Sequence, residues 1–367
     1  MKVFYDHKIF CKQERGGPSK YFLKLTQKLN ETNVNAKIFA GFHLNKFLKE
    51  SSKKNNIGFE KKLPFSNYLV NTYFVPKLNQ FNEILSSKFI KEFNPDIIHT
   101  TYYNGNFDRY NKPLVVTVYD LIHELFYKSY GYKSPQLTKK IALERADHII
   151  CISKSTANDL IKFYDVDPNK ISITYLGVEK KFISPSNSPV DYPYILYVGN
   201  RHKYKNFKVF LESLSINLKI LENFKVILFG GGKLTKHEIN LIKSYNLDTK
   251  NFSFFEGNND LLNIFYQNAR LLIFPSEYEG FGLPILEGFA NNCPVVCSDI
   301  PAFREVANEA AEYFDSNNAD SVAESMHKVL FSDFIRNELI SKGKQRLKFF
   351  DWMKCAVETK EIYKKLI

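Results

Sequence analysis

Two series of short apolar runs organise this chain, and each run is followed by a longer stretch in which apolar and polar residues mix at helical spacing. Runs of this length fit strands covered on both faces, and their alternation with helical stretches is typical of parallel sheets flanked by helices. The sequence therefore predicts an α/β fold with two parallel-sheet domains. The predicted strands of the first series are Lys2 to Tyr5, Ala36 to Phe39, Ile97 to Thr100, Leu114 to Val118 and His148 to Ile152. Those of the second are Tyr194 to Val198, Val226 to Phe229, Phe252 to Phe255, Leu271 to Phe274 and Val295 to Cys297.

A stretch rich in proline and serine, Ser184 to Val190, separates the two series and has no apolar period, which is typical of a linker. At 367 residues the chain is longer than one hydrophobic core usually supports. We therefore expect a first domain over residues 1–185, a second over 190–345 and a charged helical end over 346–367. The sequence holds no apolar run near the roughly 20 residues that a membrane-spanning helix needs, and its start does not resemble a secretory signal.

The densest chemical signal lies in the second half, where a strand, an acidic glycine-rich turn and a helix follow one another. Leu271 to Phe274 predicts a buried strand, Glu279 stands in the turn, and Pro284 fits the first turn of the helix that carries Glu287. Amides at a helix start beside the end of a buried strand favour a ligand with anionic and hydroxyl groups. The alternative is one solvated acid in a loop and one on a helix surface.

Glu279 and Glu287 have seven residues between them, and GFGLP follows the first directly. This arrangement resembles the E-x7-E motif of the retaining family 4 glycosyltransferases, which have the GT-B fold. The resemblance implies two Rossmann-like domains facing an interdomain cleft, the first for the acceptor and the second for a nucleotide-sugar donor, with residues 346–367 crossing back to the first. It also implies that Glu279 faces the donor sugar and Glu287 binds the ribose hydroxyls. The residues whose amides would line the sugar and phosphates are Gly280, Phe281, Gly282 and Leu283.

Cations that follow the strand at Tyr194 to Val198 fit the same resemblance, because the family holds the donor diphosphate there with an Arg-Lys pair. Lys205 matches the lysine, whereas Tyr204 stands in the place of the arginine, so Arg201 or Lys203 has to supply the second charge. A fixed cation there stabilises the negative charge left on the departing diphosphate. The alternative is a solvated basic loop.

Glycine turns add weaker signals. Gly16 and Gly17 resemble the diglycine turn that the family places beside the donor phosphates and the acceptor, and a plain turn ahead of a helix is the alternative. Gly230 begins a glycine turn that resembles the one near the nucleotide. Glu256 ends the following predicted strand, and we expect it near the base.

Thr117 to Leu121 resembles the family segment in which a histidine often stands directly before an aspartate near the reacting sugar. Here Tyr119 replaces that histidine, as in the subgroup related to mannosyltransferases, and Asp120 is present. His123 is a further candidate on the acceptor side. Its alternative is a structural histidine.

The net charge of +12 lies wholly in the first half of the chain. Residues 1–190 carry 29 Lys and Arg against 17 Asp and Glu, whereas residues 191–367 carry 22 against 22. We therefore expect the first half to face an anionic membrane surface or a polyanionic substrate. The segment from Gly41 to Phe65 interleaves lysines with phenylalanine and leucine, which fits either a helix in a lipid interface or a solvated lysine-rich loop.

Five scattered cysteines indicate a reducing compartment, so we expect a cytoplasmic protein, with peripheral attachment to the cytoplasmic face of the membrane as a further expectation. Cys293 and Cys297 stand four apart around a predicted strand, and we expect core residues there rather than metal ligands.

Together these features predict a retaining, metal-independent hexosyltransferase without a cofactor. GDP-mannose is the first expected donor and a UDP-sugar the second, and the acceptor is a hydroxyl of a glycan or lipid-linked glycan in cell-surface polysaccharide synthesis. We expect no nucleic-acid partner. The alternatives are a GT-B enzyme that hydrolyses or epimerises a sugar nucleotide and a noncatalytic polyanion-binding protein.

Overall fold

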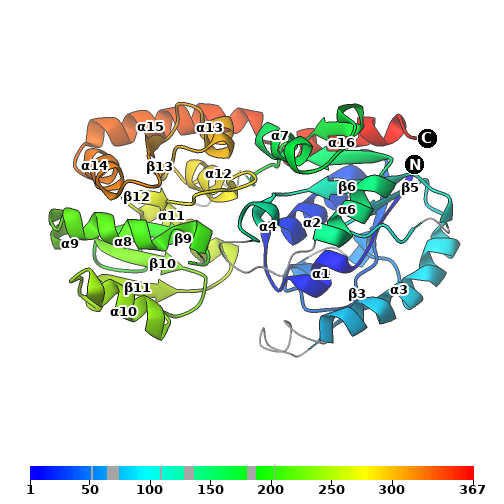
Figure 1. The fold of residues 1–367 in the computed structure, drawn as a ribbon, viewed down its shortest axis with the longest axis horizontal. Helices are drawn as coiled ribbons and strands as arrows, with labels where there is room; N and C mark the ends of the chain where they lie inside the picture. The colour runs from blue at the N-terminus through cyan, green and yellow to red at the C-terminus, as the bar shows by residue number, and fades with distance from the viewer. Residues whose placement is uncertain (51–52, 64–73, 108–109, 128–135, 180–186, 202) are drawn as a thin grey trace. The chain divides into compact units, whose positions relative to one another are not determined.

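The computed structural model describes residues 1–367 except 51–52, 64–73, 108–109, 128–135, 180–186 and 202. The chain forms two compact units, one made of Met1–Gly177 with Asp351–Ile367 and the other of Val178–Phe350. The chain passes from the first unit to the second at Val178, ahead of the predicted linker at residues 184–190. Residues 184–186 of that linker lie outside the described part of the chain. The chain returns to the first unit at Asp351, so its two ends belong to the same unit (Figure 1).

The first unit is built on a sheet whose strand order, within the described residues, is β2-β1-β5-β6-β7-β8. Each of these pairings is parallel, and a separate parallel pair joins β3 and β4. The elements are β1 (Lys2–Tyr5), α1 (Lys8–Lys12), α2 (Gly17–Asn30), β2 (Asn35–Ile38), β3 (Gly41–His43), η1 (Phe47–Glu50), η2 (Lys53–Asn55), β4 (Glu60–Lys62), α3 (Phe74–Phe93), β5 (Ile97–Thr100), β6 (Leu114–Val118), α4 (Ile122–Leu125), α6 (Gln136–Arg145), β7 (His148–Cys151), α7 (Lys154–Phe163), η4 (Pro168–Lys170), β8 (Ile171–Ile173) and α16 (Trp352–Lys364).

The second unit contains a parallel sheet of the same kind, with the order β11-β10-β9-β12-β13-β14. Its elements are β9 (Tyr194–Val198), η5 (Lys203–Lys205), α8 (Phe207–Ile216), α9 (Lys219–Asn223), β10 (Lys225–Phe229), α10 (Lys236–Ser244), η6 (Thr249–Asn251), β11 (Phe252–Phe255), α11 (Asn259–Asn268), β12 (Leu271–Phe274), α12 (Leu283–Ala290), β13 (Val295–Ser298), α13 (Pro301–Ala307), β14 (Glu312–Phe314), α14 (Ala319–Leu330), α15 (Asp333–Arg346) and η7 (Leu347–Phe349).

The strands expected from the apolar runs are all present, and their bounds differ by at most one residue from the prediction. Their continuous hydrophobic character has a simple cause, because central strands such as β6 and β12 are buried along their whole length. The prediction missed β3, β4, β8 and β14, which have three residues each; β4 is wholly charged, and the other three mix polar with apolar side chains.

The first strand of each unit occupies an interior place in its sheet, and this sets where a ligand can enter. The chain adds β2 on one side of β1 and β5 on the other. In the second unit it adds β10 on one side of β9 and β12 on the other. Loops that leave neighbouring strands in opposite directions open a crevice at the carboxyl ends of those strands, so each unit has one topological switch point.

The last helix, α16, packs against α2 of the first unit (Figure 1). The buried hydroxyl of Tyr363 lies 2.9 Å from the hydroxyl of Tyr5 and 2.5 Å from Nδ1 of His99, whose Nε2 lies 2.8 Å from Oγ1 of Thr117. Burial lowers the pKa of His99 to about 3, so the ring is neutral and acts through hydrogen bonds. This network fastens the end of the chain to the first sheet.

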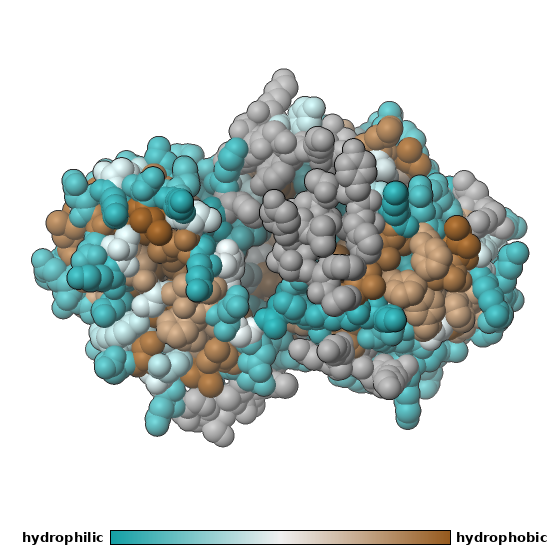
Figure 2. All heavy atoms as spheres, turned by 90° about the horizontal axis from the view of Figure 1, so that it is seen from below, coloured by the Kyte–Doolittle hydropathy of each residue, from teal (hydrophilic) through white to brown (hydrophobic). Residues whose placement is uncertain are grey.

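The lysine-rich segment expected to form either an interfacial helix or a solvated loop contains β3, β4 and short 3-10 turns, and Phe65 lies outside the described residues. Its Leu44 and Leu48 are buried in the first unit, so they do not face outward. Exposed apolar side chains occur instead on α3, among them Phe81 at 50% and Ile84 at 71% exposure, and hydrophobic residues are visible between hydrophilic ones in Figure 2. Among the described helices, none is long and apolar enough to cross a membrane.

The five cysteines are unpaired and buried. Cys293 precedes the strand β13 and Cys297 lies within it, and both are buried core residues. Burial raises the pKa of Cys293 to about 12, which keeps its thiol protonated.

Candidate functional site

Two loops meet at the switch point of the second unit, one following β9 and the other following β12. The first loop carries Arg201 and Lys205, and the second carries Ser276 and Glu279. The backbone N–H of Glu277 donates to the carbonyl of Tyr204 at 2.8 Å, which ties the loops together. The sequence-predicted cations and the first predicted acid are therefore brought to one place by the topology of the sheet.

Lys205 and Glu279 form an ion pair at this point. Their side chains are 15% and 14% exposed, so the pair is largely withdrawn from solvent but still accessible. The hydroxyl of Ser276, which is itself fully buried, donates to Oε1 of Glu279 at 2.8 Å. The Lys205 ammonium also lies 5.3 Å from the ring centre of Phe274, the last residue of β12. The carboxylate and the ammonium are thus held in fixed positions at the ends of two neighbouring strands.

The loop after Glu279 leads directly into α12. Gly282 has a φ of +118° and caps the helix, and a Cβ there would approach the Phe303 ring at 3.2 Å, so both the backbone and the packing require glycine. Leu283 begins the helix, and Pro284 fits its first turn. Phe281 turns inward and packs edge-on against Phe350 at 5.8 Å between ring centres. Gly280 and its neighbours therefore form a tight turn whose side chains face the core.

Glu287 is the fifth residue of α12 and is partly buried. The hydroxyl of Tyr266, from α11, donates to its Oε2 at 3.4 Å. Burial and the neighbouring Glu287 carboxylate raise the pKa of Tyr266 well above its usual value, so its hydroxyl remains a donor. The two predicted acids thus lie on the same loop and helix, and each accepts a hydrogen bond from a buried hydroxyl.

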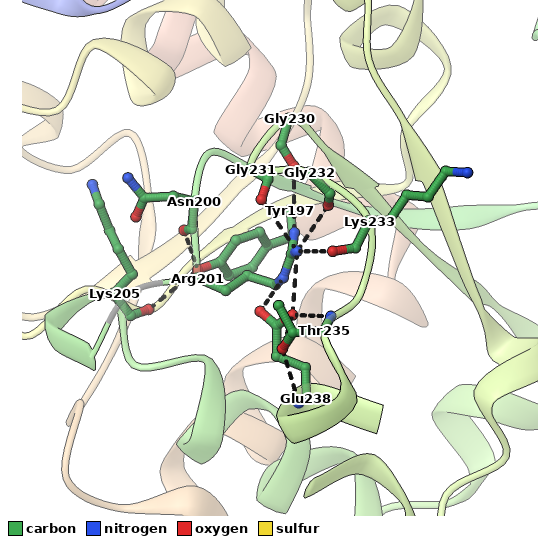
Figure 3. Close-up of polar contacts among 10 residues, drawn as sticks. All are labelled: Tyr197, Asn200, Arg201, Lys205, Gly230, Gly231, Gly232, Lys233, Thr235 and Glu238. Atoms are coloured by element: carbon green, nitrogen blue, oxygen red, sulfur yellow. Dashed lines mark hydrogen bonds and ion pairs between the residues drawn. The ribbon is translucent and has the colours of Figure 1, made fainter. Parts of the chain in front are cut away.

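Arg201 has a different environment from the one that the sequence predicts for it. Its side chain is only 2% exposed, and its Nε donates to Oε1 of Glu238 at 2.6 Å. Figure 3 shows the guanidinium surrounded by the turn after β10, where it donates to the carbonyls of Gly230, Gly232 and Lys233 at 3.3, 2.8 and 3.3 Å. This geometry does not favour Arg201 as the second cation for a diphosphate, because its donors are used within the turn.

The three glycines of this turn allow its backbone conformation. Gly230, Gly231 and Gly232 have φ values of 80°, 72° and 81°, in the left-handed region. A Cβ on Gly231 would lie 2.6 Å from the carbonyl oxygen of Gly199, so the loops after β9 and β10 are in direct contact there. The Arg201 guanidinium lies beside the same contact and donates to the carbonyl of Gly231 at 3.4 Å (Figure 3).

Glu238 is the acid that completes this arrangement. Burial alone would raise its pKa, but hydrogen bonds from Arg201 and Thr235 lower it below the usual value. Glu238 also closes a capping box at the start of α10, because Thr235 accepts from the Glu238 N–H and the Glu238 carboxylate accepts from the Thr235 N–H. The carboxylate therefore joins the glycine turn to α10.

The remaining predicted residue of the second unit, Glu256, is exposed directly after β11. It lies at the carboxyl edge of the sheet, on the far side of β10 from the Lys205–Glu279 pair. The structure therefore does not bring it together with that pair.

In the first unit, Gly16 caps α2 and Gly17 begins it, with Pro18 in the first turn. The backbone of Gly16 is extended, so its φ of 175° needs no glycine. The three atoms nearest to a Cβ there would all belong to the flexible side chain of Gln13. Gly16 and Gly17 thus form the start of α2, on the carboxyl side of β1.

The predicted acceptor-side residues have structural partners. Tyr119 is 5% exposed and its hydroxyl donates to the carbonyl of Thr101 at 3.2 Å, while burial raises its pKa well above the usual value. Asp120 accepts from the N–H of Ile122 at 3.2 Å at the start of α4. His123 lies on α4, and burial lowers its pKa, so it is neutral near pH 7. These contacts favour a scaffolding role for Tyr119 over direct contact with a substrate.

Sequence reasoning missed three partners of the predicted residues, namely Ser276, Glu238 and Tyr266. Ser276 could have been found, because it directly follows a predicted strand in the same turn as Glu279. The TKHE segment at Thr235 to Glu238 is a capping-box signature, but nothing in the sequence links it to Arg201. Tyr266 lies one helix earlier than Glu287, and only the packing of α11 on α12 joins them.

Comparison with known proteins gives two family matches that together span most of the chain. The family described as Glycosyltransferase Family 4 matches residues 15–182, and Glycosyl transferases group 1 matches residues 178–346. Among solved structures, sucrose-phosphate synthase from Thermosynechococcus elongatus superposes with a TM-score of 0.79 at 18% identity, covering 100% of this chain and 98% of that one. The chain therefore has the GT-B fold of glycosyltransferases. Within this fold class, the chain belongs to the family 4 glycosyltransferases.

Curated relatives of the chain include two mannosyltransferases. It is 31% identical to the O-antigen chain mannosyltransferase RfbU of Salmonella typhimurium over 50% of both chains. It is 27% identical to the O-antigen chain mannosyltransferase B of Escherichia coli over 61% of this chain and 62% of that protein. The matched regions thus span between half and about three fifths of the length of these relatives.

Proposed function

We propose that the protein transfers a mannosyl group from GDP-mannose to a hydroxyl of a glycan or lipid-linked glycan, with retention of the anomeric configuration, in the synthesis of a cell-surface polysaccharide. The ion pair of Lys205 and Glu279 at the switch point of the second unit carries this proposal. The similarity to O-antigen mannosyltransferases supports the choice of sugar. A UDP-sugar is the second donor that we propose.

In this proposal the Lys205 ammonium neutralises the charge that develops on the departing diphosphate, together with the positive end of the helix α12. The pairing with Glu279 keeps the ammonium in place before the donor binds. Because the ammonium is already oriented, little reorganisation is needed when the glycosidic bond breaks. The cation and the helix start serve here in place of a metal ion.

Glu279 orients hydroxyl groups of the donor sugar rather than attacking its anomeric carbon. Its Oε1 already accepts from Ser276 and pairs with Lys205, so the carboxylate is held as a hydrogen-bond acceptor. In the reaction, the bond between the anomeric carbon and the diphosphate oxygen breaks while a bond to the acceptor oxygen forms on the same face of the sugar. The acceptor proton passes to an oxygen of the departing diphosphate, so no protein group has to serve as the base.

A panel of nucleotide sugars tests the donor. Each compound is added to the full chain and thermal stabilisation is measured, because a ligand at 100 times its Kd stabilises by about 2.7 kcal/mol. We expect GDP-mannose to stabilise the wild type and the exposed-lysine variant Lys208→Ala equally, and to stabilise Lys205→Ala less. A UDP-sugar that stabilises while GDP-mannose does not would overturn the first choice of donor.

Product analysis tests the transfer. With a nucleotide sugar and a glycan acceptor, we expect a new α-linked mannoside and free GDP, and little release of GDP without the acceptor. Equal release of free mannose without acceptor would indicate hydrolysis, and a changed sugar nucleotide would indicate epimerisation. Binding of polyanions with no response to any nucleotide sugar would indicate the noncatalytic alternative.

A further inference from the structure

The switch point of the first unit contains a cavity with polar and apolar walls, and no predicted site residue lines it. It has a volume of about 590 Å³ and lies beside the carboxyl ends of β1 and β5 and the helix α3. This is the position in an open parallel sheet where ligands bind, and the volume is in the range of small-molecule sites. Its polar lining comes mainly from Asp6, His7, Gln80, Glu83, Asn104 and Asn106.

His7 is the unusual member of this lining. It is 1% exposed, and neither of its ring nitrogens has a hydrogen-bond partner among the described residues. The Asn79 backbone is near enough to influence the ring electrostatically but does not meet the geometry of a hydrogen bond. A buried polar group without a partner costs about 1–3 kcal/mol, so a partner supplied by a ligand would repay that cost.

The other polar groups of the cavity are already positioned. Asp6 accepts from the N–H of Thr101 at 2.9 Å and from the Thr100 hydroxyl at 2.8 Å, which fixes its carboxylate at the end of β1. Glu83, on α3, forms an ion pair with Lys8. Asn104 accepts from the N–H of Asn106 at 3.2 Å and is 6% exposed. The carboxylates and the Asn104 amide are therefore held in place, whereas a ligand hydroxyl reaches the buried His7 ring only when the wall beside it moves slightly.

The chemistry of this lining selects among ligands. The lining includes the carboxylates of Asp6 and Glu83 and, among the described residues, no lysine or arginine, so the cavity does not favour phosphate or another anion. Amides, carboxylates and a neutral imidazole accept from and donate to hydroxyl groups, which are both donors and acceptors. Phe107 adds an aromatic ring to the lining, and such rings pack against apolar surface. These features together suit an uncharged, hydroxyl-rich ring.

We propose that this cavity binds a sugar unit of the acceptor glycan, with the His7 imidazole hydrogen-bonded to one of its hydroxyl groups. The assignment rests on the proposed function, because it identifies the acceptor side of that reaction. It places the acceptor sugar at the ends of β1 and β5 instead of at Tyr119, Asp120 and His123. It also gives the buried histidine a function.

Histidine NMR tests the proposal without any activity measurement. The full chain is labelled with 15N at histidine, and the His7 signal is identified by its absence in His7→Gln. Methyl α-mannoside, methyl α-galactoside, methyl α-glucoside and methyl N-acetyl-α-galactosaminide are then added at millimolar concentration. We expect at least one of them to shift the His7 ring signals, and inorganic phosphate to leave them in place. A shift caused by phosphate alone, or by none of these compounds, would overturn the proposal.

Variants give the size of the effect. For the methyl glycoside that shifts His7 most, we expect His7→Phe to weaken binding about tenfold or more, because about 1.4 kcal/mol of hydrogen bonding is lost. His7→Gln, which keeps a donor and an acceptor, should stay within about threefold. The matched control is His148→Phe, since His148 lies outside the cavity and is bonded to Ser172 at 2.8 Å. Unchanged binding by His7→Phe would contradict the proposal.

A second variant covers the case in which His7→Phe does not fold. Asn104→Ala alters the wall of the cavity that follows β5, and we expect it to weaken binding of the same glycoside several-fold with an unchanged melting temperature.

Failure of the transferase proposal can be distinguished from failure of the cavity assignment. If a glycoside shifts His7 but no nucleotide sugar stabilises the chain, the transferase proposal fails and the cavity stands. If transfer occurs and His7→Gln, His7→Phe and Asn104→Ala leave the acceptor KM unchanged, the cavity assignment fails alone.

Discussion

Each unit has a parallel sheet with one switch point, but the polar groups at the two switch points are in different states. In the second unit the charged groups satisfy one another, since Glu279 is held by Lys205 and Ser276 and Arg201 is held by Glu238 and a glycine turn. In the first unit Asp6 and Glu83 have partners, whereas the buried imidazole of His7 has none within the described residues. A charged donor requires fixed counter-charges, whereas a neutral sugar requires neutral hydrogen-bonding groups that stay available. We therefore expect perturbations of the two units to affect different substrates.

The largest expected effect is at Lys205. Replacing it by alanine removes the fixed cation that we assign to the departing diphosphate, and we expect kcat to fall about 10² to 10³-fold. Steady-state kinetics with GDP-mannose measures this. Lys208→Ala removes an exposed lysine of α8 three residues later and should keep kcat within about twofold, since exposed charges contribute little. Normal turnover by Lys205→Ala would show that the ion pair is only structural.

The second prediction concerns acid sensitivity in the first unit. Burial lowers the pKa of His7 from 6.5 to about 4, the charges of Asp6 and Glu83 oppose this shift, and Lys8 adds to it. The unfolded chain therefore takes up a proton near pH 6.5, whereas the folded chain does so only near pH 4. Because the unfolded state binds more protons in this window, stability falls as the pH is lowered from 6.5 to 4, by up to about 3 kcal/mol from this residue.

Urea unfolding of the full chain at pH 7 and at pH 4.5 measures this prediction. We expect His7→Phe to lose less stability than the wild type on acidification, because the phenyl ring cannot take up a proton. His237→Phe is the matched control, because His237 is an exposed residue of α10, and its acid sensitivity should stay close to that of the wild type. Equal acid sensitivity of His7→Phe and the wild type would mean that His7 is solvated in the folded chain.

The predictability of the fold from the sequence differs between strands of four or five residues and strands of three residues. Runs such as Leu114 to Val118 lie between two strands and under helices, so their composition alone indicates a buried strand. The edge strands β8 and β14 have three residues with partly exposed side chains, and their existence depends on pairing with β7 and β13. Short edge strands have no composition of their own to indicate them.

The site shows a similar division between local and distant contacts. Lys205 and Glu279 were predicted because each follows a strand and matches a residue of the family motifs, and strand ends at a switch point come together in a parallel sheet. Arg201 was assigned to the diphosphate because its charge is visible in the sequence, whereas its partners at Gly230 to Lys233 and Glu238 come from later segments. His7 was not recognised, because a histidine next to an aspartate and a lysine gives no indication of burial.

The third prediction sharpens the contrast at Arg201. Arg201→Met keeps much of the side-chain volume but leaves Glu238 and the carbonyls of the glycine turn without their donors, and we expect a loss of about 2–4 kcal/mol of stability. Thermal unfolding monitored by circular dichroism measures it. Arg336→Met, which also removes an arginine bonded to a carboxylate but at the exposed Asp333, should cost less than about 1 kcal/mol for the lost ion pair. If both variants cost the same, the glycine turn does not depend on Arg201.

The smallest expected effect concerns the charge difference between the units. We propose that the basic first half attaches weakly to an anionic membrane surface. Because Leu44 and Leu48 are buried, we expect the lysines of residues 41–65 to bind the surface through their charge, without insertion of these leucines into the lipid. Lys61→Ala should lower the affinity for phosphatidylglycerol-containing vesicles, measured by co-sedimentation, about fivefold, since each lysine near such a surface contributes about 1 kcal/mol. Lys208→Ala, in the neutral half, should leave this affinity unchanged. Salt should abolish the binding, because attraction between exposed charges is screened. Binding that persists at high salt would instead indicate that apolar side chains such as Phe81 and Ile84 enter the lipid.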